Sequence, residues 1–207
     1  MSSGRRICLF GGTFDPVHNA HLQIADEAQK RFNLDKVLFV PAANPPHKEG
    51  IHVTPFEDRF QMVRLACEPY PLFTASRLEE GEARSYTIDT LERFRPQLKP
   101  GDELFFLIGA DAFDELKTWK RWQDVIRLTQ FIVVSRPGKS YEMPPGANVL
   151  QLDGLALPVA STTIRARLYA GQPTPELPPA VRQFIDAHSL YKAEDSLHSL
   201  SNSYRNQ

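Results

Sequence analysis

The stretch Arg6-Ile-Cys-Leu-Phe-Gly-Gly-Thr-Phe-Asp-Pro-Val-His-Asn-Ala-His21 decides the fold, because it joins three kinds of local signal in one run. Residues 6–10 are apolar and predict a strand, two glycines then predict a turn, and residues 19–32 carry apolar side chains near helical spacing. Glycines in such a turn let the backbone approach a ligand, and the helix start that follows favours a phosphate. The stretch therefore predicts a strand, an anion-binding turn and a helix.

The rest of the chain repeats this order of strand and helix. Strands are predicted at residues 36–41, 71–75, 103–108, 130–135, 149–152 and 157–160. Helices are predicted from residue 54, at 85–98, 111–116 and 121–128, and from residues 161 and 178. Residues 103–108 are apolar without alternation, which is typical of a parallel strand covered on both faces. We predict a doubly wound α/β fold with a mainly parallel sheet, helices on both faces and ligands at the carboxyl ends of the strands.

Two features organise the chain beyond these elements. Thr54, Pro55 and Glu57 predict a capping box, with the hydroxyl at the N-cap and proline at the first helical position. Residues 1–192 are predicted to form one domain, with a core at 5–160 and closing helices at 161–192. The polar, aperiodic tail at 193–207 is predicted to be disordered.

Composition excludes several classes of protein. With 24 Lys and Arg against 25 Asp and Glu, the net charge of −1 lacks the electrostatic footprint of a general nucleic-acid binder. The longest apolar runs are far shorter than the ~20 residues that span a bilayer, and the N-terminal one is too short for a secretory signal. We therefore expect a cytoplasmic protein without membrane or nucleic-acid partners. Its two cysteines are expected to be free thiols, and no oligomeric state is assigned.

Two histidines lie three residues apart at the predicted helix start. At this spacing the rings of His18 and His21 can face one side and donate N–H bonds to the same anion. The alternatives are a zinc pair or two unrelated surface histidines. Because no third ligand has motif spacing and the glutamate of a metalloprotease helix is missing, no metal site is assigned.

A second candidate anion site lies in Ser161-Thr-Thr-Ile-Arg165. Three hydroxyls and a guanidinium open a helix after a predicted strand. The alternative is an ordinary N-cap beside a surface arginine. Together with the first site, this segment would bracket a ligand with several phosphates, such as a nucleoside triphosphate.

These two segments resemble the paired signature of the HxGH nucleotidyltransferase superfamily, which shares its core with class I tRNA synthetases. More narrowly, the chain resembles the bacterial nicotinate-nucleotide adenylyltransferases over residues 5–191. Further motifs follow in that family's order: Pro45-Pro-His-Lys48, Ser85-Tyr-Thr87, Ile108-Gly-Ala-Asp111, Thr118-Trp119, Ser135-Arg-Pro-Gly138 and a closing segment from Val181 to Tyr191. One departure is Ala20, which stands where the HxGH pattern has glycine.

The resemblance implies a Rossmann-like enzyme that transfers the adenylyl group of ATP to nicotinate mononucleotide in NAD biosynthesis, with Mg²⁺ accompanying ATP. It implies catalytic roles for His18, His21 and Arg165. The implied ATP-binding residues are Gly11, Gly12, Thr13, Phe14, His18, His21, Gly109, Asp111, Ser161, Thr163, Ile164 and Arg165. The implied mononucleotide-binding residues are Asn44, Lys48, Tyr86, Thr87, Trp119 and Arg136. In this interpretation Trp119 stacks on the pyridine ring, and backbone N–H groups at residues 85–87 bind the nicotinate carboxylate.

Three alternatives to this function remain: a relative acting on nicotinamide mononucleotide, one acting on phosphopantetheine, and a nucleotide-sensing or structural module without turnover. Residues 85–87 together with Trp119 argue against phosphopantetheine. The two histidines and the intact segment 161–165 argue against a module without turnover.

Overall fold

The computed structural model describes residues 4–44, 53–82, 84–135, 141–153 and 159–192. Its centre is a parallel sheet in the order β3-β2-β1-β4-β5-β6. The strands are β1 Arg6–Gly12, β2 Lys36–Pro41, β3 Phe73–Ala75, β4 Glu103–Gly109, β5 Gln130–Ser135 and β6 Val149–Asp153. In the register, Cys8 lies opposite Val37 on one side and Phe105 on the other. Strands β1 and β4 therefore meet in the middle of the sheet.

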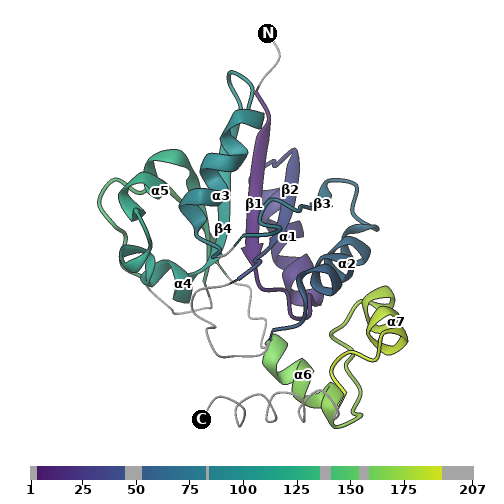
Figure 1. Cartoon of the computed structure of the whole chain (residues 1–207). Coiled ribbons are helices and arrows are strands. Elements are labelled where there is room, and N and C mark those ends of the chain that lie inside the picture. Colours follow the sequence, from purple (N-terminus) through teal and green to yellow (C-terminus); the bar gives the residue numbers. More distant parts are fainter. Residues whose placement is uncertain (1–3, 45–52, 83, 136–140, 154–158, 193–207) are drawn as a thin grey trace.

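Helices cover both faces of this sheet (Figure 1). They are α1 Asn19–Arg31, α2 Phe56–Cys67, α3 Thr87–Phe94, α4 Ala110–Asp114, α5 Trp122–Leu128, α6 Ser161–Tyr169 and α7 Pro179–Ala187. Helices α1 and α2 lie on one face, and α3, α4 and α5 lie on the other (Figure 1). The prediction of a doubly wound α/β fold is confirmed.

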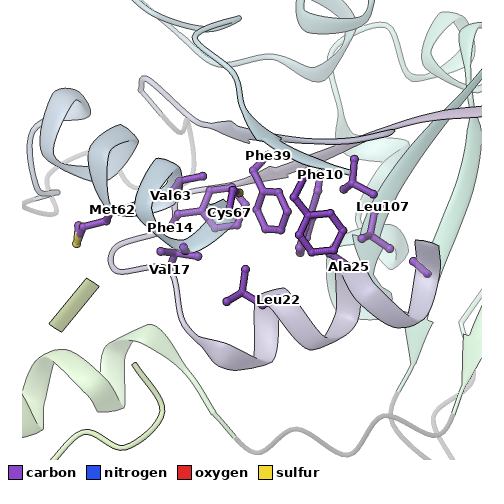
Figure 2. Packing of buried hydrophobic residues seen from close by; sticks show 14 of the residues in the cluster. Phe10, Phe14, Val17, Leu22, Ala25, Phe39, Met62, Val63, Cys67 and Leu107 are labelled. Atoms are coloured by element: carbon purple, nitrogen blue, oxygen red, sulfur yellow. The ribbon is translucent and has the colours of Figure 1, made fainter. Parts of the chain in front are cut away.

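Alternate residues of each central strand enter two separate hydrophobic clusters. Leu107 packs with the α1 and α2 cluster, whereas Phe106 and Ile108 pack with the α3, α4 and α5 cluster. Figure 2 shows the first cluster, in which the rings of Phe10 and Phe39 lie between β-strands and α1. Burial on both faces explains why the central strands are continuous apolar runs instead of alternating ones.

The predicted capping box of α2 is wrong. The helix begins one residue later than expected, with Pro55 at the N-cap and no capping bond from a side chain. The carbonyl of Thr54 instead accepts a hydrogen bond from Arg59 Nε at 2.7 Å, and Glu57 pairs with Arg77 at 2.7 Å. The bonds of the predicted capping box are therefore absent, and Glu57 is engaged by an arginine outside the helix.

Other boundaries also differ from the predictions. Helix α3 is shorter than residues 85–98, since Pro96 has no N–H to donate and the chain continues as a 3₁₀ turn over Arg95–Gln97. The predicted helix at 111–116 is α4 followed by a 3₁₀ turn over Leu116–Thr118. Of the predicted strand at 157–160, residues 157 and 158 lie outside the described part, and residues 159 and 160 form no strand.

Cys8 and Cys67 are free and buried, as expected. No helix in the described segments is long and apolar enough to cross a membrane. The tail at 193–207 lies outside the described residues, and the assignment of residues 1–192 to one domain stays a prediction.

Candidate active site

The chain leaves β1 for one face of the sheet and leaves β4 for the other, so a topological switch point lies between their carboxyl ends. Two cavities open there and share Ile108 in their walls. The first, here called the histidine cavity, has a volume of about 290 Å³. The second, the tryptophan cavity, has a volume of about 490 Å³. This is the place where open α/β sheets bind ligands.

Residues from the ends of strands β1, β2, β4 and β5 and from helices α1, α3, α4 and α6 contribute to these walls. The histidine cavity is lined by Phe10, His18, Ala20, His21, Ile24, Ile108, Gly109, Ala110, Asp111, Val134, Ser135, Val159, Ala160 and Ser161. The tryptophan cavity is lined by Gly11, Gly12, Thr13, Val40, Ala42, Glu79, Ser85, Tyr86, Thr87, Phe106, Ile108, Ala112, Thr118, Trp119 and Lys120.

The structure brings the two predicted histidines together. His18 is the N-cap of α1, and its ring stacks on that of His21 with the centroids 3.7 Å apart. The backbone N–H of His18 donates to Nδ1 of His21 at 3.2 Å, so the proton of the His21 ring lies on Nε2. Each ring can therefore present an N–H donor to the histidine cavity without carrying a charge.

Burial determines the charge of this pair. It lowers the pKa of His18 to about 4. It also lowers the pKa of His21 well below its usual value, and the neighbouring His18 ring adds to that shift. Both imidazoles are neutral at pH 7.

The glycine turn forms a wall of the tryptophan cavity. A Cβ at Gly12 would lie 2.8 Å from the ring of Phe14, so only glycine fits there. Phe14 lines neither cavity, but its ring packs edge-on against His21 with the centroids 5.1 Å apart. Gly11, Gly12 and Thr13 thus lie on the tryptophan side of the switch point, whereas Phe14 supports a histidine ring.

Helix α6 brings the second predicted anion site against the histidine loop. Ser161 lines the histidine cavity, and its hydroxyl donates to the carbonyl of Pro16 at 3.1 Å. Arg165 donates to the carbonyl of Asp15 at 2.6 Å and lines neither cavity. Thr163 is exposed and Ile164 is buried in the core, and both lie outside the cavity walls.

Gly109, the last residue of β4, and Asp111, in α4, line the histidine cavity. In the tryptophan cavity, Tyr86 is the N-cap of α3 and Thr87 its first residue. Trp119 lies edge-on to Phe106 with the centroids 6.4 Å apart. The first N–H groups of a helix have no partner within it, so the start of α3 can bind a carboxylate.

The remaining mononucleotide candidates are placed differently. Asn44 lines neither cavity. Its backbone N–H donates to Ser85 Oγ at 3.1 Å, and this bond joins the loop after β2 to the loop before α3. Lys48 and Arg136 lie outside the described residues.

Sequence reasoning missed Arg59, which is 1% exposed behind the cavity wall. Its guanidinium donates to the carbonyls of Thr13 at 2.8 Å and Ala42 at 2.7 Å, in addition to that of Thr54. It thereby ties the loop after β1 to the loop after β2. The available signal was a charged residue among the apolar positions of a helix.

Glu79 was also missed. It is buried in the wall of the tryptophan cavity and accepts a hydrogen bond from the Thr90 hydroxyl at 2.5 Å. Nothing in the local pattern around Glu79 distinguishes it from the glutamates beside it. Within the described ranges, no group of three His, Cys, Asp or Glu side chains could hold a metal ion.

The comparisons with known proteins agree with this geometry. The family model described as cytidylyltransferase-like matches residues 9–167. A protein of Solibacter usitatus named "Probable nicotinate-nucleotide adenylyltransferase" is 54% identical over 186 residues, which cover 90% of this chain and 99% of that protein. A protein of the same name from Thermus thermophilus is 44% identical over 189 residues, covering 90% of this chain and 100% of that protein.

Among solved structures, the nicotinic acid mononucleotide adenylyltransferase of Plasmodium falciparum complexed with NaAD superimposes with a TM-score of 0.75. It is 18% identical and covers 90% of this chain and 97% of that one, which supports the fold alone. The sequence relatives match over nearly their whole length. The chain therefore belongs to the cytidylyltransferase-like family and, within it, to the nicotinate-nucleotide adenylyltransferases.

Proposed function

We propose that the protein transfers the adenylyl group of ATP to nicotinate mononucleotide, giving nicotinate adenine dinucleotide and pyrophosphate in NAD biosynthesis. The observation that carries this proposal is the pair of adjoining cavities at the switch point. One holds two stacked imidazoles, and the other holds an indole beside a helix N-terminus. Two ligands bound there would meet at the wall formed by Ile108. The names of the sequence relatives support the same reaction.

The histidine cavity would take the phosphates of ATP. The Nε2–H group of His21 and the ring of His18 would donate hydrogen bonds to phosphate oxygens, while Ser161 and Gly109 line the same space. Because the imidazoles are neutral, their dipoles stabilise developing negative charge without proton transfer. Arg165, held at the carbonyl of Asp15, adds a fixed positive charge beside this cavity.

The reaction itself needs no base. A phosphate oxygen of the mononucleotide, already ionised at pH 7, attacks the α-phosphorus of ATP. A new P–O bond forms as the bond to the bridging α–β oxygen breaks, and pyrophosphate leaves with that electron pair. Catalysis then rests on holding the two anions in line and stabilising the charge that reaches the leaving group.

The tryptophan cavity would take nicotinate mononucleotide. Trp119 would stack on the pyridine ring, and the N–H groups at Tyr86 and Thr87 would bind the carboxylate. The backbone of Gly11, Gly12 and Thr13 forms part of the wall of this cavity. From the sequence, Asn44, Lys48 and Arg136 remain candidates near this site.

Magnesium would enter with ATP. Within the described residues, the carboxylate in the wall of the histidine cavity is that of Asp111, and no group of three His, Cys, Asp or Glu side chains could hold a metal ion. Mg²⁺ is often held by one or two carboxylates, substrate phosphates and several waters, so this donor set fits an ATP-bound ion. When bound, the ion would neutralise charge on the phosphates.

A pyrophosphate-release assay tests the proposal. Purified protein is mixed with ATP, Mg²⁺ and either nicotinate mononucleotide, nicotinamide mononucleotide or phosphopantetheine. We expect release with the nicotinate substrate and formation of the corresponding dinucleotide. Release with phosphopantetheine alone, or with none of the three, would overturn the proposal.

A further inference from the structure

Asp15 lies in the loop between β1 and α1, three residues before His18, and is 2% exposed. Each of its three oxygen atoms has a partner. The carbonyl accepts from Arg165 at 2.6 Å, Oδ1 accepts from the hydroxyl of Tyr191 at 2.6 Å, and Oδ2 accepts from the N–H of Thr54 at 3.4 Å. One buried residue thus joins the histidine loop to α6, to the segment before α2 and to the chain beyond α7.

Tyr191 follows α7 and is 4% exposed. Its φ of 59° lies in the left-handed region, which a bulky residue holds only when its surroundings demand it. Burial, with the nearby Asp15 carboxylate, raises the pKa of the phenol. The hydroxyl is therefore a permanent hydrogen-bond donor to Asp15.

Neither Asp15 nor Tyr191 is among the described residues that line the histidine cavity or the tryptophan cavity. They lie behind the wall of the histidine cavity, where Asp15 belongs to the loop that carries His18 and its carbonyl holds Arg165. A carboxylate oxygen buried at this depth without a donor is strongly disfavoured, so loss of the phenol hydroxyl would move Asp15. Any movement of Asp15 displaces both the carbonyl that holds Arg165 and the loop that leads to the stacked histidines.

We propose that Tyr191 is a positioning residue, which fixes Asp15 and through it the alignment of the two histidines with Arg165. This role rests on the proposed adenylyl transfer. Tyr191 sets the geometry in which charge is stabilised during transfer and contributes nothing to the two substrate pockets themselves. Its loss therefore acts on turnover rather than on substrate affinity.

Tyr191→Phe tests this role, because the variant removes one oxygen and keeps the ring. Tyr70→Phe is the matched control, since Tyr70 stacks on Phe73 away from both cavities. We expect kcat to fall about 10-fold in Tyr191→Phe, less than the roughly 100-fold that a 1 Å misplacement costs, with both KM values within about twofold of wild type. An unchanged kcat in a variant with a lowered melting temperature would show a purely structural role and overturn the proposal.

A second measurement does not depend on activity. In ¹⁵N spectra of the ligand-free protein, the imidazole signals of His18 and His21 should shift in Tyr191→Phe and stay in place in Tyr70→Phe. Unshifted signals in both variants would overturn the proposal. Wild-type protein that releases no pyrophosphate would refute the proposed function instead, and the spectra would then decide the inference.

Asp15→Asn replaces Tyr191→Phe if the latter does not fold at the assay temperature. It weakens the bond from the Tyr191 hydroxyl, because a neutral amide oxygen replaces the anionic acceptor, and it places an NH₂ donor against the N–H of Thr54. We again expect kcat to fall while both KM values stay within about twofold of wild type. Equal changes in kcat and in both KM values would contradict the positioning role.

Discussion

At the residue scale, the stacked pair of His18 and His21 determines which charge and which hydrogen-bond donors the wall of the histidine cavity offers. Two imidazolium ions at a centroid separation of 3.7 Å would repel each other, and burial disfavours the charged form further. The pair is therefore a set of neutral donors with fixed directions. Donors that are already in place need not reorient when charge develops on a phosphate. This preorganisation makes electrostatic stabilisation of a transition state efficient.

Removing either ring should reduce turnover. We expect His18→Ala and His21→Ala each to lower kcat by roughly 10²–10³, with smaller changes in KM, because the bonds strengthen in the transition state. Steady-state kinetics with folding checked by circular dichroism measure this effect. Near-normal turnover in both variants would remove the histidines from the mechanism.

The same burial predicts a dependence of stability on pH. His18 titrates at about 4 in the folded protein and near 6.5 when unfolded. Between these values the unfolded chain binds more protons, so the free energy of unfolding falls as pH is lowered from 6.5 towards 4. For His18 this amounts to on the order of 3 kcal/mol.

Urea unfolding of wild type and His18→Gln across this pH range measures the slope. We expect a shallower slope in the variant, with the contribution of His21 remaining. Parallel slopes in wild type and His18→Gln would contradict the assignment.

Spacing alone predicted that the two histidine rings would face one side, because residues three apart in a helix are neighbours. It could not predict Arg59, whose carbonyl partners Thr13 and Ala42 lie 46 and 17 residues away. Nor could it predict that Phe14 supports His21 instead of touching a ligand cavity. Such roles depend on which loops the sheet brings together.

At the element scale, the start of α3 should determine the choice between acid and amide substrates. Thr87 is the first helical residue, where proline is well tolerated, and Tyr86 has the extended conformation that a following proline requires. Thr87→Pro should therefore fold and lose one N–H. An unmade bond costs roughly 1–3 kcal/mol, so the ratio of kcat/KM for nicotinate over nicotinamide mononucleotide should fall about tenfold.

Trp119→Ala is the companion variant. Its ring contact is the same for both substrates, so we expect both kcat/KM values to fall by similar factors. If Trp119→Ala abolishes the preference while a folded Thr87→Pro preserves it, selectivity comes from the ring contact and the role given to α3 is wrong.

Helix α2 contributes stability through Arg59. Arg59→Met leaves several buried carbonyls without donors, so we expect a loss of roughly 3 kcal/mol in the free energy of unfolding. The KM for mononucleotide should rise more than that for ATP, because Thr13 and Ala42 line the tryptophan cavity. Urea unfolding and initial rates measure both effects.

The matched control is Arg64→Met on the same helix. Arg64 is exposed and pairs with Glu68, and such surface pairs contribute at most about 1 kcal/mol. Equal losses of stability in the Arg59 and Arg64 variants would show that the buried guanidinium is not needed to hold the two loops.

Elements were most predictable where burial on both faces produced uninterrupted apolar runs. Strands β2 and β5 match their predicted bounds to the residue. The start of α2 was not predictable, because Glu57 pairs with Arg77 and the backbone N–H of Thr54 donates to Asp15, both of which are distant in the sequence. Local patterns failed where distant segments compete for the same polar groups.

At the scale of the whole molecule, the two cavities on opposite sides of one switch point predict direct transfer between two bound substrates. In the proposed arrangement each substrate would have its own cavity, and Ile108 belongs to both walls. Initial-rate plots against both substrates should therefore intersect, and ATP alone should release no pyrophosphate. Parallel plots, or a burst of pyrophosphate without mononucleotide, would indicate a covalent adenylyl-enzyme and contradict this arrangement.

The hydrogen bond between Asp15 and Tyr191 also has a consequence for folding during translation, because it joins residues that are 176 positions apart in the sequence. A ribosome adds about 5–20 residues per second, so about 9–35 s pass between the synthesis of the two partners. By the end of that interval the nascent polypeptide carries both histidines and the strands β1 to β6, but it still lacks the hydroxyl that holds Asp15. Under the proposed positioning role, the histidines and Arg165 reach their final alignment only once Tyr191 has been added.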